Sequence, residues 1–112
     1  MKGNIAISEG ALISLMGLAA HEVPGVVGMA PVNIREGILK ILGRTESGQG
    51  VVLTRGKDGL GYTADLCVIV AYGVSIPQVG QSIVERVENA METIAGLKMT
   101  QITVHVVGVS HG

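Results

Sequence analysis

Apolar residues recur at two spacings along this chain, and the two spacings predict helices mixed with strands. One helical stripe consists of Leu12, Leu15, Met16, Ala19 and Val23, which stand three or four positions apart. Ser8 precedes this stripe as a favourable N-cap, and Pro24 with Gly25 would end the helix. We therefore expect a helix from Ser8 to about Glu22.

A second helix has the clearest start signal in the chain. Ser75 is a suitable N-cap, Pro77 lies in the first turn, and Gln78 stands three positions after the cap, as in a capping box. The expected buried stripe is Ile76, Val79, Ile83, Val87, Ala90, Met91 and Ile94. Gly96 supplies a C-terminal stop, so this helix should end just before it.

Alternating or β-branched runs predict strands elsewhere. The five expected strands are Gly3–Ser8, Val26–Val32, Val51–Arg55, Leu60–Tyr72 and Lys98–Val109. The pair Asp58-Gly59 favours a tight hairpin between the third and fourth of them. Between the second and third strands, we expect a short helix at Ile34–Leu42 and a polar loop at Arg44–Gly50.

The resulting order is β-α-β-(short α)-β-β-α-β, within one domain that spans residues 1–112. Two main helices on one face of a mixed β-sheet make a two-layer α+β sandwich. A chain of this length buries roughly two-thirds of the surface that its unfolded form exposes, so it needs neither a disulfide nor a metal to fold.

Side chains of the fourth strand should divide between two faces. Leu66, Val68, Val70 and Tyr72 would face the helices, and Asp65, Cys67, Ile69 and Ala71 would point away from them. Hydrophobic residues make up 47% of the chain and charged residues only 15%, against a usual value of about 25%. This excess predicts apolar surface that meets another polypeptide, the alternative being a tight core beneath a glycine-rich surface. The expected contact residues are Ile13 and Leu18, which widen the apolar arc of the first helix, and Cys67, Ile69, Ala71 and Val107 on the outer sheet face.

The sequence offers little to a catalytic centre, a cofactor or a metal ion. His21, His105 and His111 are not at metal-ligand spacing, and Cys67 belongs to no recognisable catalytic or metal-binding motif. The glycine-rich stretch from Gly43 to Gly50 lacks the Lys-Ser/Thr pair of a phosphate loop and precedes a strand. We therefore expect no enzyme activity, no cofactor and no metal site.

Charge and composition narrow the partners and the location. The net charge is −1, Phe and Trp are absent, and only Tyr62 and Tyr72 are aromatic, which argues against nucleic-acid binding and an RNA module. The longest uncharged stretch is interrupted by Gly73 and Pro77, so no direct membrane span is expected. One unpaired cysteine fits a reducing, cytoplasmic compartment.

Several segments together resemble one known family. They include Gly25-Val26-Val27-Gly28-Met29, Asp65 to Gly73 (DLCVIVAYG) leading into Ser75-Ile76-Pro77, Thr93 to Leu97 (TIAGL), and the closing Val104 to Val109 (VHVVGV). Together with the start at Gly3 to Ser8 and the run Ile34–Leu42, the match covers nearly the whole chain. The pattern is similar to the alkaline shock protein family, also called the envelope stress response family of Gram-positive bacteria and formerly DUF322.

The resemblance implies a non-enzymatic, mostly cytosolic protein, some of whose relatives form assemblies and are held at the membrane by a separate anchor protein. It also implies kinship with a subgroup often encoded beside a dihydroxyacetone-kinase-like fatty-acid kinase. We therefore expect a scaffold or adaptor in envelope stress response and homeostasis, acting as a homo-oligomer and through an anchor or kinase-related partner. The alternative is a regulatory domain for a small ligand such as a lipid, linked to fatty-acid metabolism. In that alternative, the loop after Gly43 and the hairpin would close over the ligand, and the first helix would line its cavity.

Overall fold

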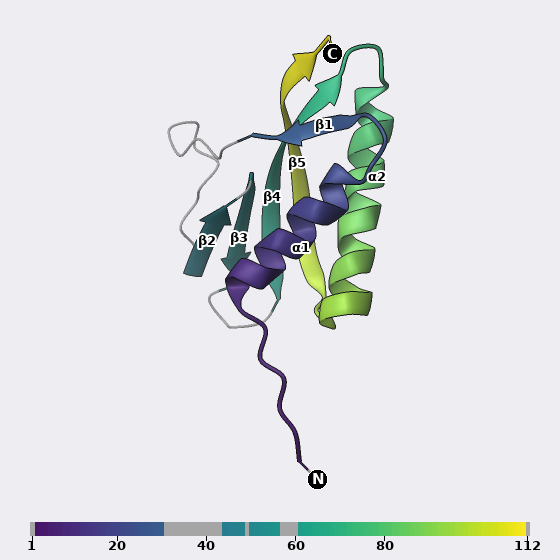
Figure 1. Ribbon diagram of the computed structural model, residues 1–112. Helices are drawn as coiled ribbons and strands as arrows, with labels where there is room; N and C mark the ends of the chain where they lie inside the picture. The colour runs from purple at the N-terminus through teal and green to yellow at the C-terminus, as the bar shows by residue number, and fades with distance from the viewer. Residues whose placement is uncertain (1, 31–43, 49, 57–60, 112) are drawn as a thin grey trace.

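The computed structural model describes residues 2–30, 44–48, 50–56 and 61–111, and these form two helices against a five-stranded sheet (Figure 1). The elements are α1 (Glu9–His21), β1 (Val26–Met29), β2 (Arg44–Gly48), β3 (Val51–Arg55), β4 (Tyr62–Ala71), α2 (Ile76–Ala90) and β5 (Met99–Ser110). A π-helical turn, η2 (Met91–Ala95), extends α2. The mixed sheet and the two-layer α+β sandwich confirm the fold class expected from the sequence.

Strand β4 lies at the centre of the sheet. β5 runs parallel to it along one edge, with partners from Tyr62–Met99 to Ala71–Ser110. Two antiparallel strands share the other edge: β3 pairs with the first half of β4 and β1 pairs with the second half. β2 is antiparallel to β3 and extends the sheet outward. Every long-range strand pairing except that of β2 therefore involves β4.

Both helices cover the same face of the sheet (Figure 1). α1 packs on β1, β2 and β3 as well as on α2, and α2 packs on β5. Each helix begins at the serine expected from the sequence: the Ser8 hydroxyl accepts the Ala11 N–H at 3.1 Å, and the Ser75 hydroxyl accepts the Gln78 N–H at 3.4 Å. Gly96 follows η2 in a left-handed conformation (φ 70°), as expected of a helix stop.

The core lies between the helices and the sheet. Its fully buried members include Leu12 and Met16 of α1, Leu66 and Val68 of β4, and Ile83 of α2. Ile102, Val104 and Val106 of β5 pack against this cluster from the edge, as their alternation predicts. No polar or charged side chain of the described residues is buried. Burial of aliphatic groups therefore supplies most of the favourable free energy of folding.

Two expectations about the strands are wrong. Gly3–Ser8 forms no strand, and Ile5 of this segment is 93% exposed in an extended tail that leaves the body of the molecule (Figure 1). A segment with alternating apolar residues becomes a strand only where its backbone can pair with the edge of a sheet. Gly3–Ser8 has no such pairing, so the first element of the chain is α1. Conversely, Arg44–Gly48 is strand β2 rather than part of a loop, because its backbone pairs with β3 from Arg44–Arg55 to Gly48–Val51.

Two other expected strands have different ends in the described residues. The expected strand from Val26 ends at Met29 in the described residues, and Tyr72 lies just past the end of β4. Tyr72 is exposed rather than turned to the helices, and its ring stacks on that of His111 with 4.4 Å between centroids. The short helix at Ile34–Leu42 and the Asp58-Gly59 turn lie outside the described residues.

Truncation of Ile83 tests the position of the core. Ile83→Ala removes a completely buried side chain and should lower the free energy of unfolding by about 2–5 kcal/mol, because it deletes apolar contacts and leaves a cavity. Ser82→Ala, at the exposed neighbouring position, should change it by less than about 0.5 kcal/mol. Urea denaturation followed by circular dichroism measures both; equal effects would place Ile83 outside the core.

Candidate functional site

The sheet face opposite the helices carries an apolar patch at the carboxyl end of β4. We define the outer apolar patch as Val27 of β1, Ile69 and Ala71 of β4, and Val107 of β5. Val27 is 47% exposed and Val107 46% exposed, and the other two are half-buried. None of the four belongs to the core cluster or packs against it. The patch therefore spans three neighbouring strands without contributing to the internal core.

Two β-bulges build this patch around Ile69. On β1 the register passes from Val26–Val70 to Gly28–Ile69, which leaves Val27 as an extra residue. On β5 it passes from Val106–Val68 to Gly108–Ile69, which leaves Val107 as an extra residue. A bulge sets two residues of one strand against one residue of its neighbour. The two bulges thus bring a valine and a glycine to each side of Ile69.

The glycines of the two bulges flatten the surface. Neither Gly28 nor Gly108 has a positive φ, so the backbone does not demand glycine at either position. A Cβ added to Gly28 would meet no atom within 4 Å, and one added to Gly108 would meet only the side chain of Ile69, at 3.5 Å. The fold itself therefore leaves room for larger residues beside Ile69.

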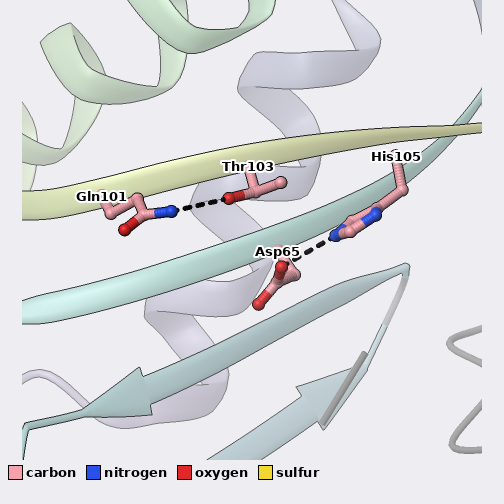
Figure 2. Close-up of polar contacts among 4 residues, drawn as sticks. All are labelled: Asp65, Gln101, Thr103 and His105. Atoms are coloured by element: carbon pink, nitrogen blue, oxygen red, sulfur yellow. Dashed lines mark hydrogen bonds and ion pairs between the residues drawn. The ribbon is translucent and has the colours of Figure 1, made fainter. Parts of the chain in front are cut away.

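Polar side chains of β4 and β5 contact one another toward the middle of the sheet (Figure 2). The Asp65 carboxylate of β4 lies 2.8 Å from Nε2 of His105 on β5, and both side chains are about one-quarter to one-third exposed. On β5 the Gln101 amide donates to the Thr103 hydroxyl at 3.3 Å. An imidazole oriented by a carboxylate is one part of a general-base arrangement, but it requires a substrate site beside it. His105 lines no part of the groove described below, so we treat the pair as a structural contact between strands.

The structure separates the six expected contact residues into two groups. Leu18 is 65% exposed on α1, Val107 is nearly half exposed, and Ile69 and Ala71 are half-buried. Their role in protein contact stays a prediction. Ile13 and Cys67, in contrast, are at most 5% exposed and cannot meet a partner in this conformation.

The burial of Ile13 has a clear cause. α1 packs on α2 as well as on the sheet, so the wide apolar arc of this helix is used within the chain. Val27 is the patch residue that sequence reasoning missed. The sequence analysis assigned no faces to the expected strand Val26–Val32, and the only available signal for a bulge was the run Val26-Val27-Gly28, in which glycine interrupts a strand.

A second surface feature lies at the opposite end of β4. An open groove of about 690 Å³ is lined by the end of β3, the start of β4 and the segment leading into β5. Its lining residues are Arg55, Gly61, Tyr62, Leu97, Lys98, Met99 and Thr100. None of these residues comes from α1, so the expectation that the first helix lines a ligand cavity is wrong for this groove.

Arg55 is fixed in the groove by Tyr62. Its Nη2 donates to the Tyr62 hydroxyl at 2.7 Å, and its guanidinium carbon lies 5.4 Å from the centroid of the same ring. The hydrogen bond to Tyr62 is the main cause that raises the pKa of Arg55 above its already high value. The guanidinium therefore stays charged throughout the physiological pH range.

Two other features are absent from the described residues. No group of three or more His, Cys, Asp or Glu side chains in this part of the chain could hold a metal ion. None of the helices in the described ranges is long and apolar enough to cross a bilayer.

Comparison with solved structures supports the fold. The chain is similar to a doubly substituted variant of the MamM CTD, with a TM-score of 0.51 and 19% sequence identity. The likeness covers 95% of this chain and 88% of that one. At this level of identity it shows a shared arrangement of helices and strands and nothing about function.

Comparison with known sequences is more specific. The chain is 32% identical over 107 residues to YqhY of Bacillus subtilis (strain 168), covering 96% of this chain and 77% of that protein. It is 32% identical over 105 residues to Spy1614 of Streptococcus pyogenes serotype M6, covering 93% and 85%. The model of the alkaline shock protein 23 family, described as having a cell envelope-related function, matches residues 1–111. This chain therefore belongs to the alkaline shock protein family that its sequence motifs resemble.

Proposed function

We propose that this protein is a non-enzymatic, self-associating adaptor that serves the cell envelope-related function of its family. The observation that carries this proposal is the outer apolar patch. Two strands display nearly half-exposed valines beside Ile69, on a sheet face that the two helices do not cover. Exposed apolar side chains that cluster on one surface favour burial against another polypeptide.

The chemistry of the patch suits a second copy of the same chain. No ionisable residue belongs to the patch, and at its border the Asp65 carboxylate is hydrogen-bonded to Nε2 of His105 at 2.8 Å, within its own chain. Two such faces can therefore meet without bringing like charges together. A two-fold contact requires a self-complementary surface, and a flat apolar sheet face satisfies this requirement through sheet-on-sheet packing at about 10 Å.

The remaining partners are part of the same proposal. A membrane-anchor protein or a fatty-acid-kinase-related partner would hold the assembly in the cytoplasm or at the membrane. Leu18 on α1 is 65% exposed and lies on the helical layer, away from the outer sheet face. It therefore offers such a partner a contact that remains open after self-association through the sheet.

The substitution Ile69→Lys tests the patch directly. It places an ammonium group at the centre of the apolar surface, where burial in an interface would cost its hydration. Ile69 is already half-buried within the chain, so loss of its contact alone removes about half of the roughly 1.5–3 kcal/mol of a fully buried isoleucine and should weaken self-association by about tenfold. Sedimentation velocity over a concentration series measures the change.

The control for this experiment is Ser82→Lys, which adds the same charge on the exposed side of α2. It should leave the oligomer distribution unchanged, and circular dichroism should show both variants folded. A wild-type protein that sediments as a monomer at every concentration would contradict the proposal, as would equal effects of the two lysines.

The glycine at the β1 bulge provides a second test. Gly28→Val adds a side chain where the fold leaves open space, so the variant should fold normally. It should nevertheless weaken self-association about tenfold, because the added methyl groups prevent close approach of the facing sheet. Gly80→Val, also in open space but on α2, is the matched control. Light scattering after size exclusion compares the two; unchanged assembly of Gly28→Val would remove this part of β1 from the contact.

A further inference from the structure

The groove at the start of β4 combines positive charge with an apolar wall. Arg55 and Lys98 reach it from different segments, which are 43 positions apart in sequence but lie on either side of the first residues of β4. Tyr62 and Leu97 add ring and aliphatic surface to the same lining, with the buried Met99 behind them. Its volume of about 690 Å³ falls in the range of small-molecule sites, about 300–1,000 Å³.

The shape of this groove depends on close packing between Gly61 and Thr100. Gly61 has φ +78°, and a Cβ there would lie 2.6 Å from Cγ2 of Thr100, so only glycine fits. Thr100 is the extra residue where the register passes from Tyr62–Met99 to Thr63–Gln101, and its hydroxyl donates to the Tyr62 carbonyl at 2.9 Å. These contacts hold the backbone of β4 and β5 at the groove in one arrangement.

The two cations are not neutralised by the surrounding described residues. Neither Arg55 nor Lys98 takes part in an ion pair within this part of the chain, and the contact of Arg55 is with the neutral Tyr62 hydroxyl. The charge of Glu9 is the smallest of the causes that act on the pKa of Arg55, and Glu9 is not among the residues that line the groove. A guanidinium has five N–H donors in a planar fork, so Arg55 retains donors for a second, anionic partner.

The apolar side of the groove favours anions that carry an apolar portion over small inorganic anions. Tyr62 and Leu97 are half-buried, and their aliphatic and aromatic surface continues toward Met99 at the edge of the core. A free inorganic anion would leave this surface in water. A ligand with an apolar portion would cover it and gain from its burial.

We propose that this groove binds an anionic amphiphile, with its carboxylate or phosphate head between Arg55 and Lys98 and its apolar portion along Tyr62 and Leu97. The site lies at the opposite end of β4 from the outer apolar patch. It does not depend on self-association, and a monomeric protein would bind the same ligand.

The experiment is a titration of isotopically labelled full-length protein, followed by two-dimensional NMR of its backbone amides. The probes are decanoate and octyl phosphate, each below its micelle concentration. Decanol, which lacks the anionic head, and inorganic phosphate, which lacks the apolar chain, are the controls. Saturable shifts centred on residues 61–62 and 97–100 are expected with both amphiphiles. Decanol and phosphate should each bind at least about tenfold more weakly, since each lacks one half of the interaction. If only decanoate or only octyl phosphate binds, the head-group class is thereby identified.

Substitutions then assign the charges. Arg55→Gln and Lys98→Gln should each weaken binding of the amphiphile by about tenfold. Arg86→Gln removes a cation of α2 that pairs with Glu22 at 3.8 Å and does not line the groove, so it should leave binding unchanged. Amide spectra of the variants without ligand show whether each is folded. The Lys98 side chain is exposed, so Lys98→Gln should fold and provides the test even if Arg55→Gln does not fold.

Three results would overturn the proposal. Decanol binding as tightly as decanoate would show that the charges contribute nothing. Phosphate binding as tightly as octyl phosphate would show that the apolar wall contributes nothing. An Arg86→Gln variant that loses as much affinity as the groove variants would show that net charge, rather than this site, attracts the anion.

Discussion

The structure depends on the pairing of β4 along both of its edges. β5 accompanies this strand over its whole length, while β3 and β1 divide the opposite edge between them. The inward residues Leu66, Val68 and Val70 consequently lie in the middle of the sheet, where α1 and α2 bury them completely. β4 pairs with strands from both ends of the chain. Its hydrogen bonds can therefore form, and its inward side chains can be buried, only when most of the molecule is folded.

The same arrangement explains why the two surface features exist where they do. The helices cover one face of the sheet, so the outward residues at the carboxyl end of β4 have nothing from α1 or α2 above them (Figure 1). The bulges in β1 and β5 then add Val27 and Val107 beside Ile69. At the other end of β4, a third irregularity at Thr100 opens the groove next to Tyr62. Departures from regular pairing thus shape both candidate contact surfaces.

Much of this fold could be predicted from local signals whose physical basis is strong. Ser8 and Ser75 accept backbone N–H groups at the starts of α1 and α2, and alternation assigned Leu66, Val68 and Val70 to the core. The errors arose where pairing decides the outcome. Gly3–Ser8 alternates without a sheet edge to join, whereas the polar Arg44–Gly48 becomes a strand because β3 accepts it. Neither result is visible in the periodicity of the segment itself.

The candidate surfaces were predictable only in part, for related reasons. Ile69, Ala71 and Val107 follow from counting outward positions on two strands, and the count still reaches Val107 because the β5 irregularity begins at that residue. The short strand β1 offered no such count, so the extra residue Val27 was not expected. Ile13 was expected at the surface because the arc of its helix is wide, and it is buried because α2 also packs on that helix. The groove is lined by two segments, around Arg55 and Lys98, that are distant in the sequence. The sequence alone does not show that these segments lie side by side.

The most direct test of the central claim, that the outer apolar patch is covered by a second copy, is methyl NMR with a soluble paramagnetic probe. Solvent access of the Val27, Ile69 and Val107 methyl groups would be measured at increasing protein concentration, with Ile5 of the exposed tail as the internal reference. Our account expects the three patch residues to lose access as concentration rises while Ile5 keeps it. Patch methyl groups that remain as accessible in concentrated as in dilute solution would contradict it.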